Sequence, residues 1–233
     1  MPETNSTTGF ALTCWSCNVR TDDGQFCKGC GKIQPAPAGS DYFALLGLLP
    51  KLAIDPAALE QRFHQLSWKL HPDNFVRSGD FERSLSLDRS SQLNDAYRTL
   101  REPVSRVEYL LRRRGVRKEG ATKQQAPPEL LEEVFALNES LDELRSARRN
   151  GGSRLVDLRQ KLEAAQQNFE TRLAEVDAKL ETMFSAWDSA LDRGADESEQ
   201  QELMARMNEI LNRRSYIRNL VANVQHELAE ENA

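Results

Sequence analysis

The stretch DPAALEQRFHQLSWKLHPDNF, residues 55–75, decides the fold of the surrounding chain. Asp55 followed by Pro56 is a helix start, because an aspartate side chain accepts hydrogen bonds from first-turn amides and proline suits the first helical position. Apolar residues then recur at spacings of four and three, at Leu59, Phe63, Leu66 and Leu70. This periodicity predicts an amphipathic helix with one buried stripe.

The tripeptide His71-Pro72-Asp73 is a candidate functional turn. Pro72 disfavours helix at His71, so we expect the helix to end there and the imidazole and the Asp73 carboxylate to project from a loop. Arg62 and Lys69 lie on one face of the preceding helix, where basic side chains would steer an acidic protein surface. The alternative is a plain helix stop, in which His71 is a cap and Asp73 a turn residue.

All four cysteines lie in one segment, residues 12–34, which we call the cysteine segment. They form two Cys-x-x-Cys pairs separated by nine residues: Cys14, Cys17, Cys27 and Cys30. Each pair can hold one side of a tetrahedral ion, so we expect a structural Zn²⁺ site whose binding energy folds the segment. Two disulfides, a redox pair, and iron or an iron–sulfur cluster on the same thiolates are the alternatives.

The C-terminal part shows the clearest helical periodicity. Three apolar stripes begin at Leu130, Leu155 and Leu203, and the breaks between them fall at residues 150–152 and at Gly194. Long amphipathic helices joined by short turns bury their apolar faces by running antiparallel, which predicts a three-helix bundle.

Composition narrows the possible functions. Of 233 residues, 39% are hydrophobic and 29% charged, and no apolar run approaches the ~18 residues of a membrane span. Residues 1–40 are neutral, 41–118 carry 14 basic and 10 acidic residues (+4), and 119–233 carry 14 and 23 (−9). This asymmetry indicates separate partners and argues against nucleic acid, which needs a strong positive field. The first dozen residues contain Glu3 and no Lys or Arg, so we expect no presequence and a cytoplasmic protein.

Three blocks in order resemble a J-domain, the module that triggers ATP hydrolysis in heat-shock chaperones of the DnaK/HscA type. DYFALLGL (41–48) is similar to its opening, HPD (71–73) to its signature turn, and QLNDAYRTLREP (92–103) to its long helix and exit.

The resemblance is closer to one J-domain family, the HscB iron–sulfur co-chaperones. It is carried by HPDNF (71–75), DYF (41–43), SRVEYLL (105–111), the three-helix extension, and CWSC (14–17), which resembles eukaryotic members. This resemblance implies an all-α fold: a J-domain plus a C-terminal antiparallel three-helix bundle, with a small N-terminal zinc-ribbon-like segment. The expected boundaries are 1–40 for the metal-binding segment and linker, 41–118 for the J-domain, and 119–233 for the scaffold-binding domain.

The resemblance also implies a co-chaperone and not an enzyme. His71, Pro72 and Asp73, with Arg62 and Lys69 beside them, would engage an HscA- or DnaK-type ATPase. The acidic bundle would hold the scaffold protein IscU, on which clusters are built, and present it to the chaperone. The scaffold-binding residues implied are Leu131, Phe135, Glu139, Glu143 and Tyr216.

The helical pattern supports part of that set. Leu131 and Phe135 each lie ~100° around the helix from the stripe residues Leu130 and Val134, so they are expected to flank the buried stripe. Tyr216 is similarly offset on the third helix. The alternative is that Leu131 and Phe135 widen the core stripe.

Two departures from the family pattern weaken the scaffold assignment more than the chaperone assignment. Glu132 stands where the family tends to have Met, and Ala136 where it tends to have Glu. Two other functions stay open: a general J-protein that delivers unfolded clients to DnaK, and a zinc-ribbon regulatory or nucleic-acid protein with a helical dimerisation region. No nucleophile–base pair, phosphate loop or carboxylate dyad is evident in the sequence.

Overall fold

The computed structural model of the chain describes residues 13–21, 24–37, 39–117, 128–150 and 154–229. Within these ranges the regular structure is helical, and no β-strand occurs in them. Two isolated antiparallel bridges join Thr13 to Arg20 and Phe26 to Ile33, one beside each cysteine pair. The all-α prediction is confirmed for the described part of the chain.

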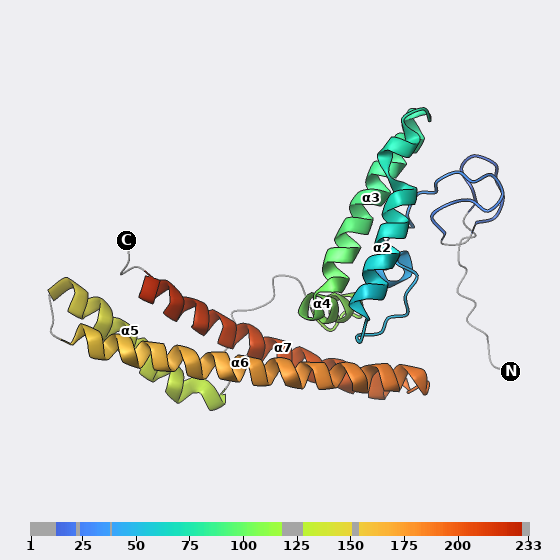
Figure 1. The fold of residues 1–233 in the computed structure, drawn as a ribbon. Helices are drawn as coiled ribbons and strands as arrows, with labels where there is room; N and C mark the ends of the chain where they lie inside the picture. Colours follow the sequence, from blue (N-terminus) through green and yellow to red (C-terminus); the bar gives the residue numbers. More distant parts are fainter. Residues whose placement is uncertain (1–12, 22–23, 38, 118–127, 151–153, 230–233) are drawn as a thin grey trace. The chain divides into compact units, whose positions relative to one another are not determined.

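The chain forms two compact units (Figure 1). The first unit comprises Met1–Pro50 and Ile54–Ser105, and the second comprises Lys51–Ala53 and Arg106–Ala233. Most of helix α4, Pro103–Arg113, therefore packs within the second unit. No helix in the described ranges is both long enough and apolar enough to cross a bilayer.

Helix α2, Pro56–Leu70, has the ends that the sequence predicts. The Asp55 carboxylate caps its start and accepts a hydrogen bond from the Ala57 amide at 3.0 Å. The helix ends at His71, and Pro72–Phe75 forms the short 3-10 helix η1. Local signals therefore determine both ends of α2.

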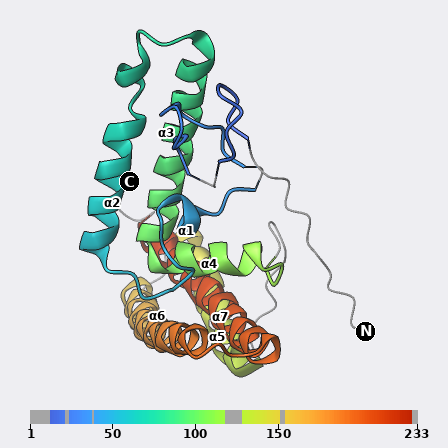
Figure 2. The same ribbon diagram turned by 90° about the vertical axis from the view of Figure 1, so that its right-hand side faces the viewer.

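Helix α3, Asp80–Arg101, runs back along α2 (Figure 2). The rings of Phe63 and Tyr97 stack between the two helices, with centroids 4.2 Å apart. A single helical turn, α1, Tyr42–Leu45, contributes buried side chains to the same unit. The core of this unit includes Phe43, Leu46, Leu59, Leu70, Leu93, Ala96 and Leu100.

The second unit contains the predicted bundle. Its helices are α5, Leu131–Asn150, preceded by the 3-10 turn η2, Pro128–Leu130, then α6, Leu155–Asp192, and α7, Glu197–Ala229. At 1.5 Å per residue, the 38 residues of α6 span about 57 Å and the 20 residues of α5 about 30 Å. Helix α5 therefore covers only about half of the α6–α7 hairpin (Figure 1).

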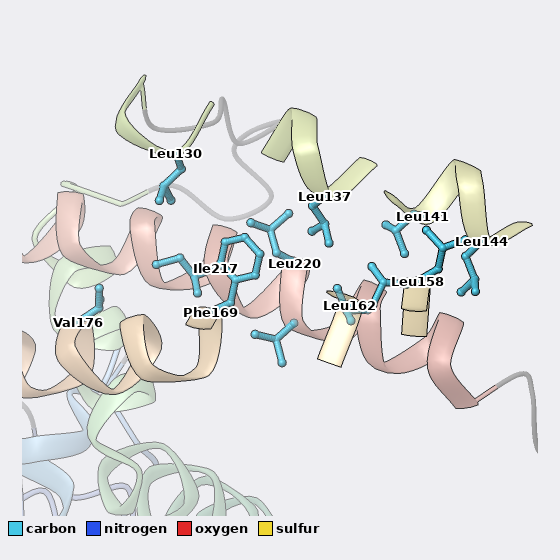
Figure 3. Packing of buried hydrophobic residues seen from close by; sticks show 12 residues of the cluster. Leu130, Leu137, Leu141, Leu144, Leu158, Leu162, Phe169, Val176, Ile217 and Leu220 are labelled. Atoms are coloured by element: carbon cyan, nitrogen blue, oxygen red, sulfur yellow. The ribbon is translucent and has the colours of Figure 1, made fainter. Parts of the chain in front are cut away.

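The bundle core follows the apolar stripes of the sequence. Figure 3 shows the buried cluster of Leu130, Leu137, Leu141, Leu144, Leu158, Leu162, Phe169, Val176, Ile217, Leu220, Val221 and Val224. Its members come from the three segments that the predicted stripes mark. The side chains of Met204 and Met207 are also buried.

A polar contact inside the second unit was not predicted. The buried Asp188 carboxylate on α6 accepts hydrogen bonds from the backbone amides of Leu52 and Ala53, at 2.7 and 3.0 Å. The guanidinium of Arg106 on α4 donates to the Leu52 carbonyl. Two consecutive residues of a loop are therefore held by side chains that come much later in the sequence.

Candidate functional site

The His-Pro-Asp turn lies at the end of the α2–α3 hairpin (Figure 2). The His71 Nδ1 atom accepts a hydrogen bond from the Asp73 backbone amide at 3.3 Å and lies 3.5 Å from the Asp73 carboxylate. The imidazole therefore caps the turn, while the Asp73 side chain is 84% exposed. The same conformation of the turn therefore lets His71 act as a cap and leaves the Asp73 carboxylate exposed.

The end of α2 is tied to its surroundings by side chains. The Leu70 carbonyl accepts hydrogen bonds from Ser86 Oγ at 2.6 Å and Ser90 Oγ at 2.9 Å. Asn74 Nδ2 donates to the Trp68 carbonyl at 2.7 Å. These bonds satisfy carbonyls that have no partner within the helix, so they fix the position of the turn.

The two basic residues predicted to accompany the turn lie at different distances from it. Lys69 is exposed on the last turn of α2. Arg62 is also exposed but lies nine residues before His71, about 13 Å along the helix. Its Nη2 donates to the Gly47 carbonyl at 3.3 Å. The structure therefore places Lys69 beside the turn and Arg62 more than two helical turns away from it.

The four cysteines come together as the sequence predicts. Their Sγ atoms all lie within 4.8 Å of one another, with Cys14 and Cys30 3.6 Å apart and Cys17 and Cys27 3.7 Å apart. A tetrahedral Zn²⁺ with Zn–S bonds of 2.3 Å requires sulfur atoms about 3.8 Å apart. All four thiols are free. This donor set fits one tetrahedral ion with no open coordination position.

Hydrogen-bond donors surround two of the sulfur atoms. The backbone amide of Ser16 donates to Cys14 Sγ, and that of Gly29 to Cys27 Sγ, both at 3.3 Å. The buried Gln34 donates to Cys14 Sγ through Nε2, also at 3.3 Å. Such donors stabilise thiolates, which are the metal-binding form of cysteine. Gln34 lies outside both pairs, and no spacing rule predicts its role.

The pKa values of the cysteine thiols depend on one another. Burial raises the pKa of Cys14, but hydrogen bonds from the amides of Cys17 and Ser16 outweigh burial and bring that pKa down to about 6. The Val19 amide lowers the pKa of Cys17, but hydrogen bonding with the other cysteines, Cys30 first, raises it to about 12. Deprotonation of one cysteine therefore makes deprotonation of the next one less favourable. The charge of a bound divalent cation would remove that cost.

The cysteine segment is docked on the first turn of α3. The rings of Trp15 and Phe81 meet edge to face with centroids 4.9 Å apart. Lys32 Nζ pairs with the buried Glu82 carboxylate at 2.5 Å, and Gln25 Nε2 donates to a carbonyl of α1 at 2.9 Å. These contacts fix the metal-binding segment within the same unit as the His-Pro-Asp turn. They join residues far apart in sequence, so motif spacing gives no sign of them.

The predicted scaffold-binding residues occupy the outer face of α5 and one position on α7. Leu131 is 41% exposed and Phe135 is 70% exposed, so neither belongs to the buried core. Glu139 and Glu143 are exposed on the same helix. Tyr216 is half-buried against the core cluster, and burial raises its pKa. Helix α5 thus presents apolar and acidic side chains together, while Tyr216 contributes mainly to packing.

A groove of about 540 Å³ separates α5 from α6 on another side of the bundle. Ala136 and Phe169 line it, and an ion pair of 2.6 Å joins Glu133 to Arg172 at its wall. Ala136, which replaces the Glu expected from the family resemblance, is exposed at this groove.

Comparisons with known proteins agree with this architecture, although no protein-family model matches the chain. The chain is 33% identical over 141 residues to the iron-sulfur cluster co-chaperone protein HscB of Mus musculus, covering 59% of this chain and 60% of the mouse protein. It is 36% identical over 144 residues to the co-chaperone protein HscB homolog of Aliivibrio salmonicida, covering 61% of this chain and 81% of that protein.

Among solved structures, human co-chaperone protein HscB matches with a TM-score of 0.63 and 28% identity, covering 93% of this chain and 98% of the human one. This match confirms the predicted fold class, a J-domain with a C-terminal three-helix bundle and a small N-terminal cysteine segment. The chain belongs to the HscB family of co-chaperones.

Proposed function

We propose that this chain stimulates the ATPase of an HscA- or DnaK-type chaperone through His71, Pro72 and Asp73. The single observation that carries this proposal is the exposed Asp73 carboxylate on a turn whose backbone is held from both helices. A charge-assisted bond from this carboxylate to an arginine of the chaperone is worth about 1.5–3 kcal/mol. Lys69 and Arg62 add positive charge that steers an acidic surface toward the turn.

The second part of the proposal concerns the bundle, which binds an iron–sulfur scaffold protein of the IscU type. Leu131 and Phe135 form the apolar part of the contact, Glu139 and Glu143 its acidic rim, and Tyr216 its edge on α7. Exposed apolar side chains beside carboxylates are typical of protein-binding surfaces. The net charge of −9 over residues 119–233 favours a basic partner.

The protein couples these two binding events and carries out no catalysis of its own. Scaffold binding on the bundle and ATP hydrolysis in the chaperone are linked through one adaptor, in support of iron–sulfur cluster assembly in the cytoplasm. The names of the mouse and human relatives, iron-sulfur cluster co-chaperones, support this role. Residues 1–40 bind the metal, residues 41–118 contact the chaperone and residues 119–233 bind the scaffold.

The metal proposed for the cysteine segment is a structural Zn²⁺ held by Cys14, Cys17, Cys27 and Cys30. Four thiolates without other donors suit this ion, and its binding supplies folding energy to a segment with little core of its own. The segment's contacts with α3 then keep the folded metal site attached to the J-domain.

ATP turnover by an HscA-type chaperone, measured with and without IscU, tests the function. We expect stimulation by this protein, a further synergistic rise with IscU, and loss of both in His71→Gln. His226→Gln, a substitution at an exposed histidine of α7, is the matched control and should keep wild-type activity. Equal stimulation by any unfolded client in place of IscU would favour the general J-protein, and no stimulation at all would refute the proposal.

A further inference from the structure

Trp68 is the most exposed large apolar side chain in the part of the chain that the structure describes, at 80%. It lies on α2 two residues from Leu66 and two from Leu70, which face the core, so its indole is on the opposite side of the helix. An isolated exposed apolar side chain is common and needs no explanation. The position of Trp68 separates it from that ordinary case.

The backbone of Trp68 is part of the structure that holds the His-Pro-Asp turn. Its carbonyl accepts the hydrogen bond from Asn74 Nδ2 at 2.7 Å, so the end of α2 and η1 cannot move independently there. Trp68 precedes His71 by three residues, about 4.5 Å along the helix axis. The backbone of Trp68 is therefore held within one helical turn of the residue that begins the motif.

Any protein that binds Asp73 also comes close to Trp68. A standard interface buries about 800 Å² on each partner, which corresponds to a disc with a radius of about 16 Å. A disc of that size centred on the turn reaches Trp68, the adjacent Lys69, and Val76, another exposed apolar residue just after the turn. Tryptophan is among the residues that most often dominate binding energy in such interfaces.

We infer that Trp68 is an apolar anchor of the surface that contacts the ATPase chaperone and inserts into an apolar depression on that partner. The inference rests on the proposed function and assigns different roles to two residues. Asp73 triggers hydrolysis through its charge, whereas Trp68 supplies affinity because burying its indole removes a large apolar surface from water. Lys69 next to it provides the charge that orients the approach.

The kinetic test measures chaperone ATP turnover against the concentration of this protein. Trp68→Ala should raise the concentration that gives half-maximal stimulation at least tenfold and leave the maximal rate unchanged, and Trp68→Phe should give a smaller increase. Asp73→Asn should instead lower the maximal rate. Leu49→Ala, at an exposed apolar residue in the loop that precedes α2, is the matched control and should match the wild type.

Fluorine NMR of the full chain labelled with 5-fluorotryptophan gives a direct readout. The chain has three tryptophans, Trp15, Trp68 and Trp187, and Trp187 is fully buried. On addition of unlabelled ATP-bound chaperone, the Trp68 resonance, assigned with Trp68→Phe, should shift and lose its solvent isotope effect. The Trp187 resonance should not move.

Each outcome bears on a different claim. A Trp68→Ala protein with a wild-type half-maximal concentration, or an unchanged Trp68 resonance under full stimulation, overturns the inference and leaves the proposed function intact. A Trp68 resonance that shifts with protein concentration alone assigns the side chain to self-association and also overturns the inference. Absence of stimulation by the wild type refutes the proposed function itself.

Discussion

Replacing Phe135 by alanine should weaken scaffold binding about 10- to 100-fold. The residue is 70% exposed, and a phenylalanine that presents about 200 Å² leaves about 140 Å² in water. Complete burial of that area at about 25 cal/mol per Å² is worth about 3.5 kcal/mol. A partner buries only part of it and alanine keeps its methyl group, so we expect about 1.4–2.8 kcal/mol, which gives the stated change in Kd.

The substitution should leave the bundle folded, because Phe135 is not a member of the buried cluster between the helices. Surface substitutions away from special contacts change the free energy of unfolding by about 0.5 kcal/mol or less. Val156→Ala is the matched control, since Val156 is a 67% exposed apolar residue on α6 and lies outside the predicted scaffold-binding set.

Isothermal titration of IscU into the wild type, Phe135→Ala and Val156→Ala measures the three dissociation constants. Binding of Phe135→Ala within twofold of the wild type would refute the assignment of the outer face of α5. Equal losses in the two variants would show that the scaffold responds to general surface hydrophobicity instead of this site.

Three further predictions concern stability. Removing metal with a chelator should abolish dispersed amide signals from the cysteine segment while helical circular dichroism persists, and unchanged signals would contradict a structural metal. The hydrogen bond from Arg145 lowers the pKa of Glu227 below its usual 4.5. Glu227 therefore stabilises the fold above that pH and the contribution is lost as the pH falls through the lowered pKa. Near neutral pH, denaturation of Glu227→Gln should give a free energy of unfolding about 1–2 kcal/mol lower than that of the wild type. This difference should shrink below pH 4.5, whereas a difference that is constant with pH would exclude the ion pair. Asp188→Ala should cost about 2 kcal/mol and speed hydrogen exchange at the Leu52 amide. Asp157→Ala, at an exposed aspartate on the first turn of α6, should not change that exchange rate.

Local signals in the sequence predict much of the fold. The ends of α2 follow from Asp55-Pro56 and from Pro72, because capping and proline geometry act within a few residues. The apolar stripes of the bundle follow from a period of 3.6 residues per helical turn, which is visible in the sequence of each helix alone. The metal cluster follows from ligand spacing, since each pair closes its own turn.

Contacts between distant segments could not be predicted in the same way. Glu82 and Arg89 are charged residues, a type usually found at the surface, yet both are buried on α3. The docking of the cysteine segment on Phe81 depends on surfaces that exist only after both parts have folded. Likewise, nothing in the sequence indicates which backbone amides Asp188 binds.

The helical periodicity of α2 also contains information that its motifs do not. Trp68 falls opposite the stripe that includes Leu66, so its exposure follows from helix geometry alone. Beside a functional turn, a large apolar residue at a position that must face water is a candidate for binding a partner.

The hydrogen bonds between the Asp188 carboxylate and the amides of Leu52 and Ala53 limit how this protein can be divided into fragments. A product that stops after Ser105 would keep both amides but lose their acceptor, and one that starts at Arg106 would keep the carboxylate but lose its donors. Either piece would carry a defect that the intact chain does not have. Activity lost on excision would therefore not show that the missing half binds anything.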